Sequence, residues 1–397
     1  MKILLIGLLV VVTTGGPTED SPRAQYEAIV KEFDTAYKAA MDAVTKASND
    51  QERIDASSRR PQPHEFAARL FALAEQHPED AAALDALTWV ASKCIFGPHA
   101  EKALGMIARL HGRSERLKDF CGQCSRYGEP FPPYEEMLRV VLKNNPHREV
   151  QAAACLSLAE YLKMAKEKTE SRLVKLTLDG GMPLSSDQMK NVQRMKERGL
   201  DAVAAESAAL FQKVIDEYGD IRFENNYPPK AADYARGQLY LLRNLGIGLR
   251  APEIVGKDIY GKAMKLSDYR GKVVVLDFGS HRSCGVCRQF YPYLRTMVET
   301  FKEKPFALLG ISVDDDVKDL VTLAEKGENT WPIWWDGKDL EGPLASQWVI
   351  TSMPTFFVLD QNGVIRNQGF IQPDEIAATV NMLLREMGEA KKAKAAG

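Results

Sequence analysis

The sequence predicts a multidomain chain in which an all-α, solenoid-like helical repeat region precedes an α/β domain. Two patterns support this class. Residues from about 20 to 245 place apolar side chains at helical spacing and lack strand alternation, whereas short apolar runs bounded by turn residues follow residue 250. The length of 397 residues is enough for two or three domains. We therefore expect a helical region at 17–246, an α/β domain at 250–388 and a tail at 389–397.

The first sixteen residues have the pattern of a secretory signal peptide. Met1-Lys2 supplies positive charge, residues 3–12 form an apolar run, and Thr13-Thr14-Gly15-Gly16 supplies small residues for cleavage. The run is too short to span a bilayer as a mature helix. We therefore expect residues 1–16 to be removed and the protein to be exported to the periplasm or cell envelope with no stable membrane span. An uncleaved N-terminal anchor is the alternative.

A helical repeat is expected within 17–246. Turn residues recur at Pro78, Gly112 and Pro146, at intervals of 34 residues. That period is typical of tetratricopeptide-like helical hairpins, although the match to their consensus is poor. The spacing predicts stacked helix pairs of this or a similar solenoid type, in which each pair buries the apolar face of its neighbour. A long helix at 186–218 and a final helix at 230–244 are expected to follow.

A first CxxC motif, Cys121-Gly122-Gln123-Cys124, falls within this repeat. The 34-residue period aligns its cysteines with apolar positions of the neighbouring pairs, which are Leu87, Val90, Cys155 and Leu158. A cysteine in such a position behaves as a small hydrophobic residue. We expect Cys121 and Cys124 to be core thiols. A regulatory or relay disulfide that exchanges with the second CxxC motif is the alternative.

The α/β domain is predicted from apolar strands that alternate with a helical pattern. The expected order is strand, helix, strand, helix, X-Pro, hairpin and helix. Strands are expected at 273–278, 306–313 and 355–360, with a returning strand at 364–366 and a helix at about 318–326. Gln361-Asn362-Gly363 supplies the turn residues of the hairpin.

The second CxxC motif, Cys284-Gly285-Val286-Cys287, lies between the first of these strands and a predicted helix. Two thiols at this spacing can close and reopen a disulfide. Cys284 would lie at the helix N-terminus, where unpaired N–H groups and the helix dipole favour the thiolate, the attacking species in disulfide exchange. Cys287, one turn further along, would be the resolving thiol. A permanent disulfide or two inert thiols is the alternative.

Residues from about 250 to 388 resemble the TlpA/ResA-like thioredoxin-fold proteins, which are thiol-disulfide oxidoreductases of the bacterial cell envelope. The resemblance rests on the strand ending at Phe278, the CxxC motif after it, Pro292 and the Met353-Pro354 sequence. It implies a thioredoxin-like domain in which Pro354 follows a cis peptide bond and its loop faces the disulfide. No cofactor and no metal ion are expected.

The resemblance also suggests supporting residues. Related folds carry, near the end of the first strand, a buried acid that helps proton transfer to the second thiol, a role that Asp277 would take here. Met353 and Pro354 would form an apolar surface for an extended substrate segment, with Trp334 or Trp335 nearby. Burial in the domain core is the alternative for both tryptophans. The chain departs from the family pattern at Ser283 and Val286, where an aromatic residue and often a proline are usual, and residues 279–283 form a segment one residue longer than usual.

Positive charge surrounds the second CxxC motif. His281, Arg282 and Arg288 lie close enough in sequence to lower the pKa of Cys284. Ordinary solvated side chains on a loop are the alternative for each of the three. Zinc binding by the two CxxC pairs is compatible with the ligand type, but nothing in the sequence brings the pairs together.

These features predict an exported thiol-disulfide oxidoreductase whose substrates are protein disulfides or dithiols and whose helical repeats bind a partner. A reductase outside the cytoplasm would need an electron-donor protein of the envelope. The alternatives are a scaffold or protein-binding module with a redox-inert thioredoxin fold, and a thiol-dependent peroxidase. The peroxidase motif Pro-x-x-x-Thr-x-x-Cys is absent, because Asp277 and His281 occupy its first two positions before Cys284. A net charge of −2 with mixed charges gives no electrostatic case for nucleic acid binding.

Overall fold

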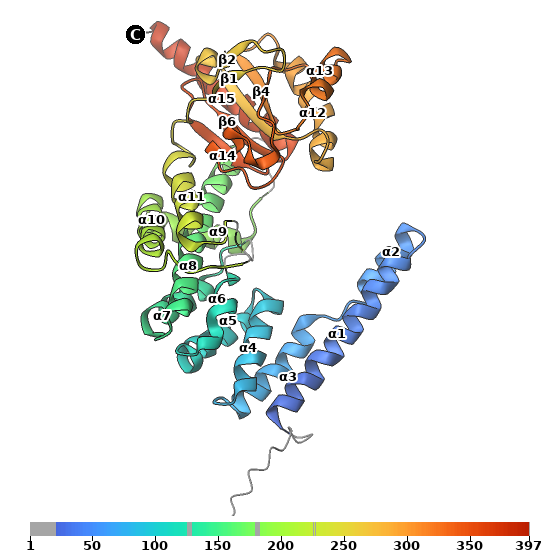
Figure 1. Cartoon of the computed structure of the whole chain (residues 1–397), viewed down its shortest axis with the longest axis vertical. Coiled ribbons are helices and arrows are strands. Elements are labelled where there is room, and N and C mark those ends of the chain that lie inside the picture. Colours follow the sequence, from blue (N-terminus) through green and yellow to red (C-terminus); the bar gives the residue numbers. More distant parts are fainter. Residues whose placement is uncertain (1–20, 125–128, 179–182, 225, 227, 397) are drawn as a thin grey trace, which may run out of the picture. The chain divides into compact units, whose positions relative to one another are not determined.

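The computed structural model describes residues 21–124, 129–178, 183–224, 226 and 228–396 (Figure 1). The predicted signal peptide, residues 1–16, lies outside the described residues. The chain forms two compact units, one containing the described residues up to 124 together with Phe131–Ser157, the other containing residues 129–130 and everything described from Leu158 onward. The domain boundaries expected from the sequence remain predictions.

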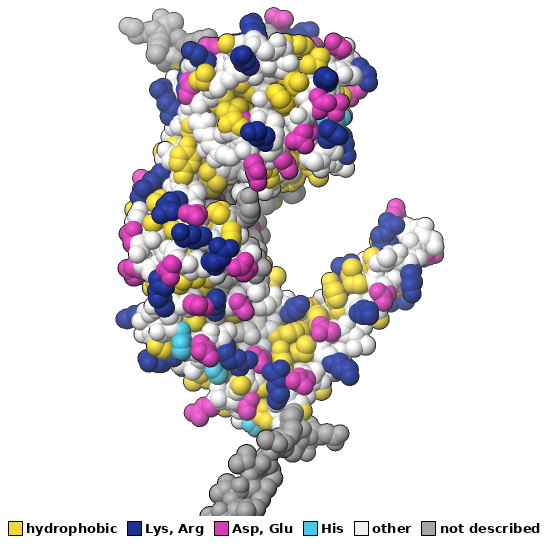
Figure 2. All heavy atoms as spheres, viewed as in Figure 1, with side chains coloured by type: hydrophobic (Ala, Val, Ile, Leu, Met, Phe, Trp, Pro, Cys, Tyr) yellow, Lys and Arg dark blue, Asp and Glu magenta, His cyan; other side chains and the backbone are white. Residues whose placement is uncertain are grey.

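The surface carries mixed charge. On the face drawn in Figure 2, Lys and Arg side chains are interspersed with Asp and Glu side chains in both units, as the balanced composition of 52 basic and 54 acidic residues suggests. Within the described ranges, no helix combines the length and the apolar character needed to cross a bilayer.

The first unit is all-α. Its α-helices are α1 (Pro22–Lys46), α2 (Asp50–Ser58), α3 (Pro63–Gln76), α4 (Ala81–Cys94), α5 (Pro98–Met106), α6 (Lys118–Cys121), α7 (Pro132–Asn144) and the first part of α8 (Arg148–Thr177). A π-helical turn (Ile107–His111) and a 3-10 turn (Glu115–Leu117) lie between α5 and α6. In Figure 1, α3, α4 and α5 follow one another as packed neighbours. Asn49 and Asp80 cap α2 and α4 by accepting a backbone hydrogen bond from the first turn.

The predicted turns occur where the sequence places them. His77-Pro78 separates α3 from α4, Gly112 follows the π-helical turn, and Asn145-Pro146 separates α7 from α8. The core positions predicted from the 34-residue period are confirmed by burial, since each of the six is at most 2% exposed: Leu87, Val90, Cys121, Cys124, Cys155 and Leu158. The tetratricopeptide-like nature of the repeat remains a prediction.

The predicted long helix at 186–218 is two helices, α9 (Ser186–Arg198) and α10 (Leu200–Glu217). Gly199 separates them with φ of +80°, a left-handed conformation that side chains with a Cβ rarely adopt and that commonly ends helices at glycine. The prediction of one continuous helix was therefore wrong at this glycine. The final helix is confirmed as α11 (Ala231–Asn244).

The α/β domain is built on a sheet that, in the described part of the chain, has five strands in the order β5-β4-β3-β6-β7. They are β3 (Val273–Gly279), β4 (Phe306–Ser312), β5 (Ile333–Trp335), β6 (Thr355–Leu359) and β7 (Ile365–Gly369). β4 is parallel to β3 and β5, whereas β6 is antiparallel to β3 and β7. The predicted strands are confirmed, and β5 and the small hairpin of β1 (Val255–Lys257) and β2 (Ala263–Lys265) were not predicted.

Helices cover this sheet. They are α12 (Gly285–Phe301), α13 (Val317–Glu325), α14 (Pro343–Gln347) and α15 (Pro373–Ala396), together with 3-10 turns at Leu266–Tyr269 and Asp339–Glu341. Alternate residues of β3 serve two cores: Val273 and Val275 pack with α12, α13 and α15, and Leu276 and Phe278 pack in a second cluster with Trp348. Each fully buried side chain of this kind contributes about 1.5–3 kcal/mol. The alternation turns Asp277 toward the α12 side.

The turn between β6 and β7 depends on glycine. Gly363 has φ of +73°, and a Cβ there would lie 1.2 Å from Nη1 of Arg270, which donates a hydrogen bond to the Asn362 carbonyl (2.9 Å). The turn joins β6 to β7. The first residue of β6, Thr355, pairs with Phe278 at the end of β3. The Met353-Pro354 loop is thereby brought to the edge of the sheet from which the second CxxC motif emerges.

Candidate active site

A disulfide joins Cys284 and Cys287 at the start of α12, with an S–S distance of 2.05 Å. Cys284 is the N-cap residue of the helix, and its Sγ accepts a hydrogen bond from the Cys287 N–H at 3.0 Å. Cys284 is 8% exposed and Cys287 is 1% exposed. After reduction, the helix N-terminus would stabilise a thiolate at Cys284. The environment therefore makes Cys284 the more accessible and the better stabilised of the two sulfurs.

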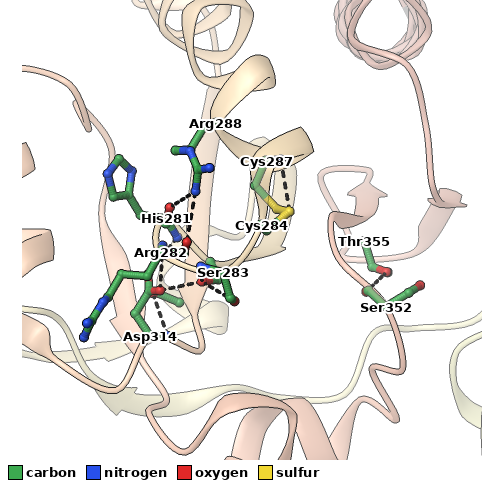
Figure 3. Close-up of a disulfide and its surroundings, with 11 residues drawn as sticks. His281, Arg282, Ser283, Cys284, Cys287, Arg288, Asp314, Ser352 and Thr355 are labelled. Carbon is green, nitrogen blue, oxygen red and sulfur yellow. Dashed lines mark hydrogen bonds between the residues drawn. A yellow bond between two sulfur atoms is a disulfide. The ribbon is translucent and has the colours of Figure 1, made fainter. Parts of the chain in front are cut away.

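The Met353–Pro354 peptide bond is cis, as the resemblance implied. Met353 is half-buried and packs against the core cluster that contains both cysteines, and Pro354 is buried. The loop is fastened at its end by a hydrogen bond from Thr355 Oγ1 to the Ser352 carbonyl (2.8 Å), and Figure 3 shows this segment beside the disulfide. The two chain segments predicted to form the site are therefore neighbours.

Asp277 lies behind the disulfide on β3. Asp277 is 5% exposed, and within the described residues its Oδ1 has no hydrogen-bonding partner. A Cβ placed on Gly279 would lie 3.5 Å from both Asp277 Oδ1 and Cys287 Sγ, so the carboxyl and the inner sulfur border the same small space. Burial raises the pKa of Asp277 to about 7. The group can therefore accept or release a proton beside Cys287 near neutral pH.

The three basic residues near the disulfide have contacts of their own. The His281 ring stacks on Tyr291, Arg282 Nε lies 3.6 Å from Asp319 Oδ2, and Arg288 Nη1 donates hydrogen bonds to the carbonyls of His281 (2.6 Å) and Arg282 (3.0 Å). In Figure 3 the side chains of His281 and Arg282 point away from the two sulfurs. An effect of these charges on the pKa of Cys284 remains a prediction.

Asp314, directly after β4, is a residue of the site that the sequence analysis missed. Its carboxylate accepts hydrogen bonds from the Ser280 hydroxyl, the His281 N–H (2.8 Å), the Arg282 N–H (3.0 Å) and the Ser312 hydroxyl (2.9 Å). Burial acts to raise the pKa of Asp314, but these hydrogen bonds outweigh it and hold the pKa below its usual value. A carboxylate at the carboxyl end of a strand parallel to β3 was the available signal.

The two tryptophans predicted near the substrate surface differ in their surroundings. Trp334 is fully buried, and its Nε1 donates to the Met264 carbonyl (3.2 Å), so it is a core residue, the alternative considered for it. Trp335 is 43% exposed, and its Nε1 donates to the carbonyl of Asp314 (2.7 Å). Only Trp335 has the exposure that a surface role needs.

The first CxxC motif lies in a different environment. Within the described residues, Cys121 and Cys124 are buried free thiols, and Cys124 Sγ donates to the Phe120 carbonyl (3.2 Å). Burial raises the pKa of Cys121 to about 12, and burial together with the neighbouring Cys121 raises that of Cys124 well above its usual value. Both sulfurs are therefore protonated at neutral pH, which favours the structural interpretation.

A mixed sheet whose first long strand leads into a helix capped by a disulfide, with a cis-proline loop beside it, defines a thioredoxin-fold redox protein. The family model described as AhpC/TSA family matches residues 247–368. The thiol-disulfide oxidoreductase ResA of Geobacillus kaustophilus (strain HTA426) is 30% identical over 122 residues, which are 31% of this chain and 68% of that protein. This chain belongs to the ResA/TlpA-like family of thiol-disulfide oxidoreductases.

Two further relatives match the chain over a similar share. The thioredoxin-like protein YneN of Bacillus subtilis (strain 168) is 29% identical over 135 residues, 33% of this chain and 76% of that protein. The crystal structure of the thioredoxin domain of a thiol-disulfide oxidoreductase from Bacteroides vulgatus covers 36% of this chain and 99% of its own, at 29% identity and a TM-score of 0.33. The match to the ResA protein confirms, at the level of family, the enzyme class predicted from the CxxC motif.

Proposed function

We propose that this chain is an exported oxidoreductase that exchanges disulfides with protein substrates through Cys284 and Cys287. The asymmetry of the pair carries the proposal: the outer sulfur caps a helix, whereas the inner sulfur is 1% exposed beside a buried carboxyl. Residues 250–388 would form the catalytic domain, and residues 17–246 would bind a partner. Removal of residues 1–16 would release the mature protein, with 389–397 as its tail.

The exchange would proceed in two steps. The Cys284 thiolate attacks one sulfur of the substrate disulfide, forming a mixed disulfide and releasing the other substrate sulfur as a thiolate that takes a proton. The Cys287 thiol then gives its proton to the Asp277 carboxylate and attacks Cys284 Sγ. The second substrate thiolate leaves, and two electrons have passed from the protein to the substrate. The reverse sequence oxidises a substrate dithiol.

The substrate segment would lie along Met353 and Pro354, the apolar loop beside the disulfide. Val286, between the two cysteines, is 41% exposed and would add an apolar side chain to the substrate surface. In the reducing direction the disulfide formed in each cycle must be reduced again. We propose an electron-donor protein of the envelope for that step.

A redox titration tests the exchange. The mature protein would be equilibrated in glutathione buffers of graded potential, its thiols trapped with a mass-tagging alkylator and the tags mapped by mass spectrometry. We expect one reversible two-electron transition at Cys284 and Cys287, retained in the matched double variant Cys121→Ala, Cys124→Ala. Thiols at 284 and 287 that never cycle, or a transition that maps to 121 and 124, would contradict the proposal.

Export and substrates need separate experiments. Fractionation of bacterial cells that express the full chain, with the N-terminus mapped by mass spectrometry, should place a protein lacking residues 1–16 in the envelope fraction. An intact N-terminus in the cytoplasmic fraction argues against export. The variant Cys287→Ala should accumulate mixed disulfides with envelope proteins at Cys284, and the double variant that also lacks Cys284 provides the background.

A further inference from the structure

The loop before Cys284 is held at its backbone N–H groups by one buried carboxylate. Asp314 is 4% exposed. Its carboxylate accepts hydrogen bonds from the N–H groups of His281 and Arg282 and from the hydroxyls of Ser280 and Ser312 (Figure 3). Hydrogen bonds to an ionised acceptor are about twice as strong as those between neutral groups. The carboxylate therefore fixes the course of the loop at several consecutive residues.

The same loop is held at its carbonyl groups by a side chain of α12. Arg288 Nη1 donates to the carbonyls of His281 and Arg282, the two residues whose N–H groups bind Asp314. The backbone N–H and the backbone carbonyl of both residues are therefore hydrogen-bonded to charged side chains. Asp314 is itself fixed, because its N–H donates to Ser312 Oγ (3.2 Å) and its carbonyl accepts from Trp335 Nε1.

A continuous series of hydrogen bonds links Asp314 to the residue before the attacking sulfur. The Ser280 hydroxyl donates a hydrogen bond to Asp314, and its oxygen accepts hydrogen bonds from the Ser283 N–H (3.0 Å) and the Ser283 hydroxyl (2.8 Å). Ser283 is bonded to Cys284, whose Sγ must lie at the first turn of α12 to accept the Cys287 N–H. Displacement of the loop would move the sulfur away from the N–H groups that stabilise its thiolate.

We infer that Asp314 is a positioning residue for disulfide exchange, which holds residues 280–283 so that Cys284 remains at the N-terminus of α12. The inference rests on the proposed function. It predicts that loss of the Asp314 hydrogen bonds raises the pKa of Cys284, whereas loss of the Asp314 charge alone would lower that pKa. The negative charge of Asp314 by itself would raise the pKa of the Cys284 thiol, whereas its positioning effect lowers that pKa by keeping the sulfur at the helix terminus.

Three variants of the full-length mature protein separate these effects. Asp314→Asn removes the charge and leaves an amide that cannot accept all four hydrogen bonds, Ser280→Ala breaks the connection to Ser283 while keeping the charge, and Asp315→Asn neutralises the exposed neighbouring carboxylate as the control. The measurements are the alkylation rate of Cys284 in the reduced protein as a function of pH and the equilibrium of the dithiol with glutathione. The neighbouring side chains of His281, Asp277 and Tyr291 are retained in every variant.

We expect Asp314→Asn to raise the pKa of Cys284 by about one unit, which lowers its thiolate fraction roughly tenfold at pH values well below that pKa. At pH values well above the pKa, where Cys284 is ionised in the reduced protein, the equilibrium with glutathione should shift about tenfold toward the disulfide, or about 30 mV for a two-electron couple. Ser280→Ala should shift both quantities in the same direction by roughly threefold, and Asp315→Asn should leave both within about 1.5-fold.

A lower pKa of Cys284 in Asp314→Asn would overturn the inference, because the charge would then dominate. Unchanged values in folded Asp314→Asn and Ser280→Ala would also overturn it and leave Asp314 a purely structural role. If Asp314→Asn does not fold, Ser280→Ala decides by the same criteria. A native protein whose dithiol never cycles would refute the proposed function instead, and the alkylation profile of Cys284 would still decide the role of Asp314.

Discussion

The chain contains two CxxC motifs with the same spacing and opposite surroundings. Cys284 precedes the first residue of the 17-residue helix α12, whereas Cys121 is the last residue of the four-residue helix α6. A helix favours negative charge at its N-terminus and disfavours it at its C-terminus. Cys284 and Cys287 form a disulfide, whereas Cys121 and Cys124 are buried thiols whose pKa values are raised by burial. Spacing alone therefore does not distinguish the two motifs, whereas the position of the first cysteine on its helix does.

The largest expected difference between the motifs is in activity. Cys284→Ala should reduce disulfide exchange to the uncatalysed background, because Cys287, the other sulfur of the pair, is not accessible enough to attack. Cys121→Ala should leave the exchange rate within about twofold, since that thiol is buried and protonated. The measurement is turnover of a glutathionylated fluorescent peptide. Residual activity in Cys284→Ala that disappears with Cys121 would reverse the comparison.

The next largest difference is in thiol reactivity. In the reduced native protein at pH 7, a thiol of pKa about 12 has a thiolate fraction roughly three thousand times smaller than an ordinary thiol of pKa about 8.5. Cys284 should therefore react with iodoacetamide at least about a thousandfold faster than Cys121. Mass mapping over a time course gives both rates in one sample, and denaturation in urea should make them equal. Similar rates in the folded protein would contradict the assigned environments.

Asp277, the buried acid beside the second CxxC motif, should make the stability of the protein depend on pH. Its pKa is raised from 3.8 to about 7 in the fold, so the folded state binds the proton more tightly and stability falls as pH rises from about 4 to about 7. Asp277→Asn should remove this loss and be more stable above pH 7 by at most about 4 kcal/mol, at about 1.4 kcal/mol per pKa unit. Urea unfolding of the oxidised protein at graded pH measures it.

Two controls accompany the Asp277 measurement. Asp315→Asn, at an exposed carboxylate, should follow the native pH dependence. The gain in stability should coincide with slower resolution of a mixed disulfide at Cys284, because Cys287 then lacks its proton acceptor. Parallel stability curves for native protein and Asp277→Asn at all pH values would show that the carboxyl is not the buried acid described above.

The smallest expected effects are on stability, where a substitution at Cys121 should cost more than one at Cys284. In the fully reduced protein, Cys121→Ser places a hydroxyl in the core and should cost about 1–3 kcal/mol. Cys284→Ser puts a favoured N-cap residue at the start of α12 and should change stability by less than about 0.5 kcal/mol. Urea midpoints in dithiothreitol measure both. A larger loss for Cys284→Ser would mean that the active-site sulfur also serves as a structural residue.

Local patterns allowed much of this molecule to be predicted. The continuous apolar runs that became β3, β4 and β6 are typical of strands buried on both faces, and the 34-residue period located the buried thiols Cys121 and Cys124. The CxxC motif after a strand located the disulfide. Each of these signals lies within a few consecutive residues or within a short repeat.

The missed features depend on contacts between distant residues or on single backbone angles. Asp314 meets Ser280 across 34 residues of sequence, because the parallel pairing of β3 with β4 places Gly279 beside Ser312. Gly199 divides a pattern that is helical on both sides, and only its positive φ shows the break. Trp334 and Trp335 belong to a three-residue strand, too short to give a periodic signal, so the sequence could not decide which of the two is buried.

The hydrogen bond donated by the Cys287 N–H should report whether the Cys284–Cys287 pair is oxidised or reduced. Its hydrogen bond ends on Cys284 Sγ, which is a neutral sulfur in the disulfide and becomes a much stronger acceptor as a thiolate. The amide NMR resonance of this one residue should therefore move when two electrons arrive and return when they leave. A mixed disulfide at Cys284 again makes Sγ a neutral sulfur, so the resonance should then move back toward its position in the oxidised protein.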